Sequence, residues 1–160
     1  MRLSLHANYL RSNSITDIDF PVSPQAKLLV NELLRTTSQE PRQTLGQALV
    51  NELSSSAKIE PVTLKVSPTR QYHKKYLGRV VFKQYGYYRP QTRYVYIQNQ
   101  TPVRGQDLAP RTFLDTLLHE WMHHLDHYKL QIASIHTSGF YLRLGALKEH
   151  AGLGKRPPGD

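Results

Sequence analysis

Cysteine is absent from the 160-residue sequence. A disulfide framework, a thiolate metal site and a cysteine nucleophile are therefore excluded, so any metal must be bound by histidine or carboxylate groups. Long apolar runs are absent as well. The first thirty residues lack the apolar core of a secretory leader, and no stretch reaches the length of a membrane span. We therefore expect a cytoplasmic protein that has no contact with a membrane.

Acidic residues are missing from one segment of 46 residues, 61–106. The segment has nine Lys and Arg residues, whereas the other twelve in the chain are balanced by twelve Asp and Glu, so the whole net charge of +9 comes from it. Seven of the ten tyrosines also lie there. Cations that neutralise phosphates, together with rings that stack on unpaired bases, are typical of a nucleic-acid surface.

This basic segment predicts contact with DNA. The candidate contact residues are Arg70, Lys74, Lys75, Arg79, Lys83, Arg89 and Arg93. The composition also allows two alternatives. Tyrosine and arginine could simply cover the wet face of an antiparallel sheet, or a basic groove could select acidic peptides without any nucleic acid.

A histidine motif near residue 120 is the strongest functional signal. His119 and His123 are four residues apart, a spacing at which two imidazoles on one helix face can bind one zinc ion while Glu120 faces the water on the metal. From 112 to 128 the apolar residues recur at intervals of three and four, on the opposite side of the predicted helix. One face is therefore available for the core and the other for chemistry. The alternative is an amphipathic helix whose histidines are only its solvated face.

A catalytic zinc ion usually has three protein ligands, so a third one is required. His136, thirteen residues after His123, is the preferred candidate, near the start of a last helix predicted over 140–149. Glu149 is an alternative ligand that a later helix would supply. An arrangement in which His123 pairs with His127 at the same four-residue spacing is a further alternative.

This pattern resembles the SprT-like (Spartan-type) metalloproteases, in which HExxH is followed by a dozen or more residues and then by a histidine with an aromatic residue four positions later. The matching residues are His119, Glu120, His123, His136 and Phe140. The resemblance covers about residues 79–150 and implies a protease that acts on proteins crosslinked to DNA, a DNA-repair activity. Thr137 stands where members often have glycine, and the cysteine-free chain cannot build the zinc ribbon that many members carry.

Zinc chemistry gives each residue a role. Three neutral imidazoles leave one Zn²⁺ ion per chain its double charge, which lowers the pKa of its bound water. Glu120 then takes a proton from this water as it attacks a peptide carbonyl, and returns the proton to the leaving amine. Asp115 and Asp126 could orient the ligand histidines by accepting hydrogen bonds from them, the alternative being that each is an ordinary surface aspartate. The candidate oxyanion donors are Tyr141 and, as alternatives, Tyr94 and Tyr96; each could instead be a packing tyrosine with its hydroxyl in water.

The predicted organisation is an N-terminal arm at 1–22, one metalloprotease domain at 23–150 and a disordered tail at 151–160. Helices are expected over 23–35 and from 40 to about 54, and strands over 62–66, 79–88 and 93–98. The fold class is α+β and zincin-like: N-terminal helices, a small antiparallel sheet, the HExxH metal helix and a C-terminal helix that delivers His136. The segment 93–99 is expected to be the sheet edge to which a substrate strand adds.

The expected function is that of a zinc-dependent endopeptidase with a protein or peptide substrate. DNA would recruit it through the basic segment 61–106, so that it cleaves DNA-bound or DNA-crosslinked proteins. Two different functions stay open. One is that of a metal-dependent nucleic-acid hydrolase, and the other is that of a non-catalytic nucleic-acid-binding module that zinc only stabilises.

Overall fold

The computed structural model describes residues 4–70, 73–76, 79–83, 85–101 and 105–154, with side chains undescribed for 69–83. Over these residues the α+β class is confirmed. The elements in chain order are α1 (Leu5–Ser14), α2 (Pro24–Leu33), α3 (Gln39–Ala57), β1 (Thr63–Arg70), β2 (His73–Tyr76), β3 (Arg79–Lys83), β4 (Gly86–Arg89), β5 (Tyr94–Gln100), α4 (Pro110–Leu125), a π-helical turn η1 (Asp126–Leu130) and α5 (Ser138–His150). None of the described helices is long and apolar enough to cross a membrane.

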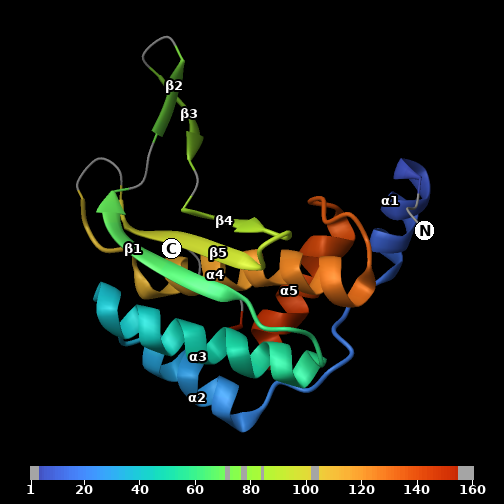
Figure 1. Cartoon of the computed structure of the whole chain (residues 1–160), viewed down its shortest axis with the longest axis horizontal. Helices are drawn as coiled ribbons and strands as arrows, with labels where there is room; N and C mark the ends of the chain where they lie inside the picture. Colours follow the sequence, from blue (N-terminus) through green and yellow to red (C-terminus); the bar gives the residue numbers. More distant parts are fainter. Residues whose placement is uncertain (1–3, 71–72, 77–78, 84, 102–104, 155–160) are drawn as a thin grey trace.

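The main sheet has three strands in the order β1-β5-β4, with β2 and β3 as a separate pair that projects beyond it (Figure 1). β5 is parallel to β1 and antiparallel to β4, so the sheet is mixed and the prediction of an antiparallel sheet is wrong. The connection from β1 to β5 includes β2, β3 and β4. It is long enough to return the chain to the starting end of β1, as a parallel pair requires.

The central position of β5 corrects a second expectation. The sequence predicts residues 93–99 as the sheet edge, but β5 lies between β1 and β4. The outer strand on the side of α4 is β4, which begins at Gly86. The single strand predicted over 79–88 is in fact two, β3 and β4, and only β4 joins the main sheet.

The other edge of the sheet is closed by side chains of α3. Gln43 and Gln47 each hydrogen-bond the backbone of β1 in both directions: Gln43 donates to Leu64 O and accepts from Val66 N, and Gln47 donates to Val62 O and accepts from Leu64 N. Gln39 donates to Val66 O. These three glutamines, spaced four apart, take the place of a neighbouring strand, so the outward backbone of β1 is already paired.

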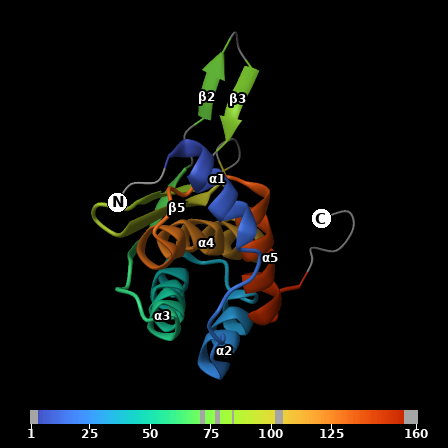
Figure 2. The ribbon, with the colours of Figure 1, turned by 90° about the vertical axis from the view of Figure 1, so that its right-hand side faces the viewer.

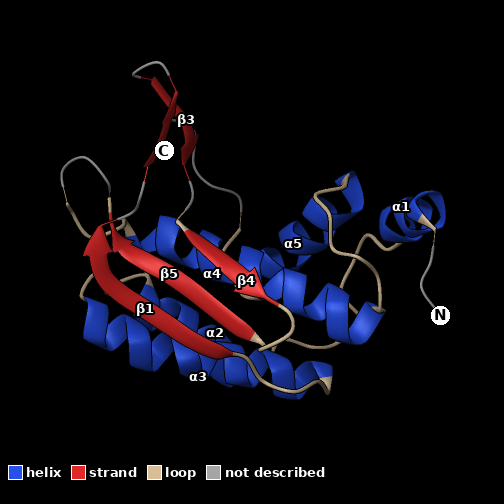
Figure 3. Ribbon diagram, turned by 45° about the horizontal axis from the view of Figure 1, so that its top comes forward, coloured by secondary structure: helices blue, strands red, loops and turns tan. Residues whose placement is uncertain are grey.

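The core lies between the sheet and the helices that cover one of its faces (Figure 3). Val95 and Ile97 of β5 are fully buried against this layer. α3 approaches β1 closely at Gly46, where a Cβ atom would lie 2.8 Å from Leu64 Cδ2. Trp121 of α4 is fully buried and its Nε1 donates to Ser54 Oγ at 3.0 Å. The apolar face predicted for α4 is therefore packed in the core.

The two ends of the chain are more ordered than the sequence indicates. Residues 5–14 of the expected arm form helix α1, which lies beside the segment between α4 and α5 (Figures 1 and 2). α1 has no apolar periodicity because the side chains it buries are polar, Asn8 and Ser12. In the expected tail, Ala151 and Leu153 are buried, so disorder does not begin at 151. Residues 155–160 of that prediction lie outside the described residues.

Candidate metal centre

Helix α4 places the first two histidines of the motif on one side and its apolar residues on the other. His119 and His123 are half-buried and lie one turn apart, with ring centroids 5.0 Å apart. His124, the adjacent residue, points the other way. It is fully buried, its Nδ1 is 2.7 Å from the Tyr88 hydroxyl, and its Nε2 is 2.6 Å from the Glu60 carbonyl oxygen.

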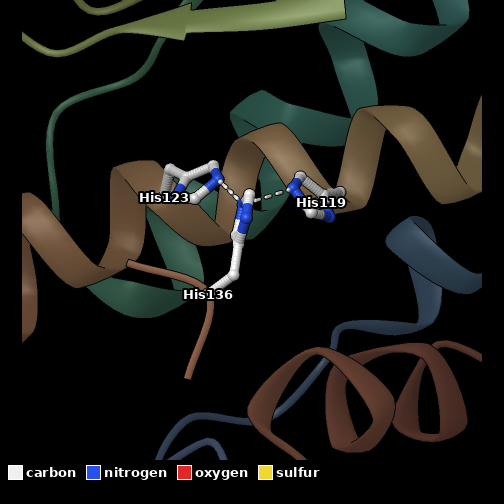
Figure 4. A group of neighbouring side chains, drawn as sticks. All are labelled: His119, His123 and His136. Carbon is white, nitrogen blue, oxygen red and sulfur yellow. Dashed lines mark hydrogen bonds between the residues drawn. The ribbon is translucent and has the colours of Figure 1, made fainter. Parts of the chain in front are cut away.

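His136 completes a group of three imidazoles. It lies in the loop two residues before α5 rather than on that helix, and its ring points between the other two (Figure 4). Its Nε2 is 3.1 Å from Nε2 of both His119 and His123. Tetrahedral zinc with Zn–N bonds of about 2.0–2.1 Å requires N···N separations of roughly 3.3 Å. These three histidines could therefore hold a metal ion of the kind that prefers imidazole ligands.

Burial keeps two of these imidazoles in the neutral form that binds metal. It lowers the pKa of His119 to about 4, with a smaller contribution from the neighbouring His136. It lowers the pKa of His123 to about 3, again helped by the nearby histidines. A neutral imidazole has a free lone pair, so metal does not have to displace a proton from either nitrogen near pH 7.

Glu120 lies beside the three histidines in a cleft of about 920 Å³. The cleft runs between β4, α4 and α5, and Gly86, Thr116 and Tyr141 are among the residues that line it. Glu120 is 7% exposed, and this burial raises the pKa of its carboxyl to about 7. The site thus combines three histidines that could hold a metal ion, a carboxyl group and an open cleft.

Of the alternative ligands and candidate oxyanion donors, some line the cleft beside the three histidines and others lie outside it. Tyr141 is half exposed, lines the cleft, and its ring centroid is 5.8 Å from that of His136. His127 also lines the cleft but is outside the group of three. Glu149 is exposed near the end of α5 and is likewise outside the group. Tyr94 and Tyr96 lie on the outer face of the sheet and do not line the cleft.

His123 has a second hydrogen-bonding partner, which the sequence did not indicate. Its Nδ1 is 2.7 Å from Ser134 Oγ, and Ser134 Oγ donates to Asp126 Oδ2 at 2.7 Å. Because the only hydroxyl hydrogen of Ser134 goes to Asp126, His123 must donate through Nδ1–H, which leaves the lone pair on Nε2 for metal. The expectation that Asp126 orients a ligand directly is therefore corrected, since it acts through Ser134. Asp115, the other expected partner, forms ion pairs with Arg111 and Lys148.

The tyrosines of the basic segment form an aromatic surface on the sheet. Tyr87, Tyr94 and Tyr96, here called the tyrosine face, lie on the side of the sheet opposite Val95 and Ile97. The rings of Tyr87 and Tyr96 stack with centroids 5.1 Å apart and an interplanar angle of 14°. The Arg89 guanidinium lies over the Tyr87 ring at 5.0 Å, and the exposed Lys65 is paired with Tyr96 across the strands.

The other predicted DNA contacts are spread over the same part of the chain. Arg93 is exposed in the turn between β4 and β5. The remaining five lie at the end of β1 or in the pair β2–β3, where their backbone is described and their side chains lie outside the described part: Arg70, Lys74, Lys75, Arg79 and Lys83. Of the predicted contacts, only Arg89 and Arg93 are therefore placed as side chains.

Comparison with protein-family models, with curated proteins and with solved structures found no match for this chain. The functional interpretation therefore rests on the residues of the site and on their geometry.

Proposed function

We propose that this chain is a zinc-dependent endopeptidase of the SprT-like type with a zincin-like fold. His119, His123 and His136 would hold one Zn²⁺ ion. The observation that carries the proposal is the convergence of three Nε2 atoms in a cleft that Glu120 also lines, with two of the N···N separations being 3.1 Å. Three histidine ligands that leave a coordination position open are typical of catalytic zinc sites, whereas structural sites are usually closed by four.

Within this proposal Glu120 is the general base. Zinc, when bound, would supply a Lewis acid that makes water acidic enough to lose a proton near neutral pH and that polarises the peptide carbonyl. Glu120 follows His119 on α4 and lines the same cleft, which supports this role: its carboxylate would accept that proton and donate it to the leaving amine. The Tyr141 hydroxyl, at the rim of the cleft, is the candidate donor to the developing oxyanion.

The substrate would be bound as an added strand along β4. Gln98 N donates to Tyr85 O, so in this antiparallel pair the backbone groups of Tyr87 face β5 while those of Gly86 and Tyr88 face outward. Gly86 and Tyr88 also line the cleft. The glutamines of α3 block the corresponding addition at β1. Main-chain pairing of this kind carries little sequence information, so cleavage should be only weakly selective for residue type.

Chelation tests the proposal. The purified protein is expected to bind one zinc ion per chain and to cleave an unstructured protein substrate, to lose that activity in a chelator, and to regain it with added Zn²⁺. Elemental analysis and a fluorescent protein substrate give the two readouts. Labelled single-stranded nucleic acid is incubated in parallel, and degradation of the strands but not of the protein would replace the peptidase with a metal-dependent nuclease. Zinc binding with neither activity would leave only a zinc-stabilised binding module.

A contact with DNA is a second proposal, and the tyrosine face supports it. Stacked rings with cations beside them are what single-stranded nucleic acid requires from a protein surface, because bases stack on the rings while Arg89 and Lys65 neutralise phosphates. Such a contact would bring DNA-bound proteins to a cleft that is itself weakly selective. DNA would then supply the selectivity.

Tyr96→Ala is expected to weaken binding of single-stranded DNA by about 1–3 kcal/mol, the amount typical of one lost stacking interaction. Tyr96→Phe is the matched control, because it keeps the ring and should bind like the parent. Fluorescence anisotropy at several salt concentrations measures both. Equal affinity of the alanine variant and the parent would remove the tyrosine face from the proposal. If DNA does not accelerate cleavage of a DNA-binding substrate, recruitment is lost while the peptidase proposal survives.

A further inference from the structure

A buried network of polar side chains surrounds the segment that carries His136. It begins at Asp126, which is fully buried and accepts hydrogen bonds from Ser134 and from Arg143. Ser134 in turn accepts from His123. Ser134 therefore connects one histidine directly to a buried carboxylate, two residues before His136.

Arg143 of α5 is the centre of this network. Its side chain is fully buried, and its Nε and Nη2 donate to the two carboxylate oxygens of Asp126 at 3.2 and 2.9 Å. Nη2 also donates to Ser12 Oγ, and Nη1 donates to the carbonyl oxygens of Ser12 and Ile15. All five N–H groups of the guanidinium are thus used. A buried ion pair is tolerated only when its hydrogen bonds are satisfied in this way.

Ser12 carries the network to the other side of His136. Its hydroxyl is 2.7 Å from Thr137 Oγ1, and Thr137 Oγ1 accepts from Phe140 N as the N-terminal cap of α5. Close contact of α1 with α5 depends on Gly139, where a Cβ atom would lie 2.1 Å from Ser12 O. Ser134 and Thr137, on the two sides of His136, are therefore both connected to Arg143, one through Asp126 and one through Ser12.

We propose that Arg143 is a positioning residue for the metal ligands: through Asp126 and Ser134 on one side, and through Ser12 and Thr137 on the other, it holds the His136 loop in its binding geometry before metal arrives. This inference rests on the proposed metal site and adds to it a role for helix α1, which supplies Ser12. The His136 side chain is exposed, and its ring contacts on α5 are with Phe140 and Tyr141. The network restricts the conformation of the loop already in the metal-free protein. Metal binding therefore costs less conformational entropy than it would with a free loop. Arg143 and Asp126 neutralise each other's charge. The ion pair therefore acts on the metal ligands by orienting them and not by adding a net charge near them.

Additional contacts from α1 hold the same loop at its ends. Asn8 accepts from Ala133 N and donates to Ala133 O, both through its side-chain amide. Asn13 Oδ1 accepts from Gly139 N and from the hydroxyl of Ser138. The bond from Ser138 joins the same two helices without reaching a ligand histidine, so this serine provides a matched control for Ser12 and Ser134.

The test is a zinc titration of the full chain against a chromophoric chelator. Ser134→Ala is expected to raise the zinc Kd by about 10- to 100-fold, the loss typical of removing a partner that orients a ligand histidine. Ser134→Thr keeps the hydroxyl and should restore the parent Kd. Ser12→Ala should weaken binding in the same range, and Ser138→Ala should not. The absorption bands of bound Co²⁺ report the ligand geometry independently, and should change in the two weakened variants alone.

The outcomes separate this inference from the proposed function. If the parent binds zinc and Ser134→Ala binds it equally tightly, the positioning role is overturned and the metal site stands. An equal weakening by Ser138→Ala would also overturn it, since the effect would then be a general loosening of α1. A parent that binds no zinc overturns both proposals. Weaker binding in Ser134→Ala and Ser12→Ala, with rescue by Ser134→Thr and unchanged melting temperatures of the metal-free proteins, is the result that supports the inference.

Discussion

Glu120→Gln is expected to lower peptide hydrolysis by about 10²- to 10⁴-fold, the range that general acid–base groups contribute. The amide has nearly the same shape as the carboxylate and fills the same buried position, but it cannot accept a proton from water. The three histidines are unchanged, so the variant should still bind one zinc ion per chain. Initial rates on an unstructured protein substrate, with elemental analysis of the same preparations, measure both quantities.

Two controls make this result specific. Tyr141→Phe, at the rim of the same cleft, removes only the candidate oxyanion donor and should cost less than the loss of the base. The melting temperature of Glu120→Gln should not fall, because the substitution replaces a charged group in a site where burial disfavours the charge. If Glu120→Gln cleaved as fast as the parent with its zinc in place, Glu120 would not be the base and the proposed mechanism would fail.

The structural features around the three histidines that agree with the sequence prediction are those with a local physical signature. The four-residue spacing of His119 and His123, against apolar residues at intervals of three and four, fixes both the helix and the face that the histidines share. His136 could be selected because few side chains downstream can bind metal and because its spacing resembles a known family. Its placement near the other two histidines agrees with that selection, although it comes from a loop rather than from α5.

What the sequence did not predict depends on contacts between distant polar residues. Gln43 and Gln47 of α3 bind the backbone of β1, and no pattern in the sequence marks them as partners of a strand. Nothing local marks Ser134 as the partner of His123, since serine is common in loops of every kind. Helix α1 buries Ser12 to meet Arg143, so the apolar period that would have identified a packed helix is missing. Polar contacts of this kind leave no periodic pattern in a sequence.

The wrong prediction of the sheet edge has a similar cause. β5 alternates tyrosine with Val95 and Ile97, a pattern that predicts a strand with one buried face and is silent about its neighbours. Whether such a strand is central or at an edge depends on which strands pair with it. Here β1, which is far from β5 in sequence, pairs with one side of β5, and β4 pairs with the other. The correction changes the proposed substrate site from β5 to β4, and so brings it to the strand whose residues line the cleft.

The second large effect is expected for His136→Ala. This variant removes one of the three proposed ligands, so zinc affinity should fall by more than the roughly 10- to 100-fold loss typical of an outer hydrogen-bond partner. Two imidazoles on α4 alone would leave the ion with too few protein ligands for a stable catalytic site. Zinc Kd, measured by competition with a chelator, and the zinc content after dialysis are the readouts, and peptidase activity should be lost with the metal.

His127→Ala is the matched control, because His127 lines the same cleft and lies four residues after His123, yet is outside the group of three. It should bind zinc like the parent. If instead His127→Ala lost zinc and His136→Ala kept it, the ligands would be His123 and His127, and Glu120 would no longer lie between two ligands on α4. A loss in neither variant would point to Glu149, the remaining candidate, and Glu149→Gln would then decide it. The two histidine variants thus distinguish three arrangements that the spacing of this sequence leaves open, and only the one with His136 uses the loop that Arg143 and α1 hold in place.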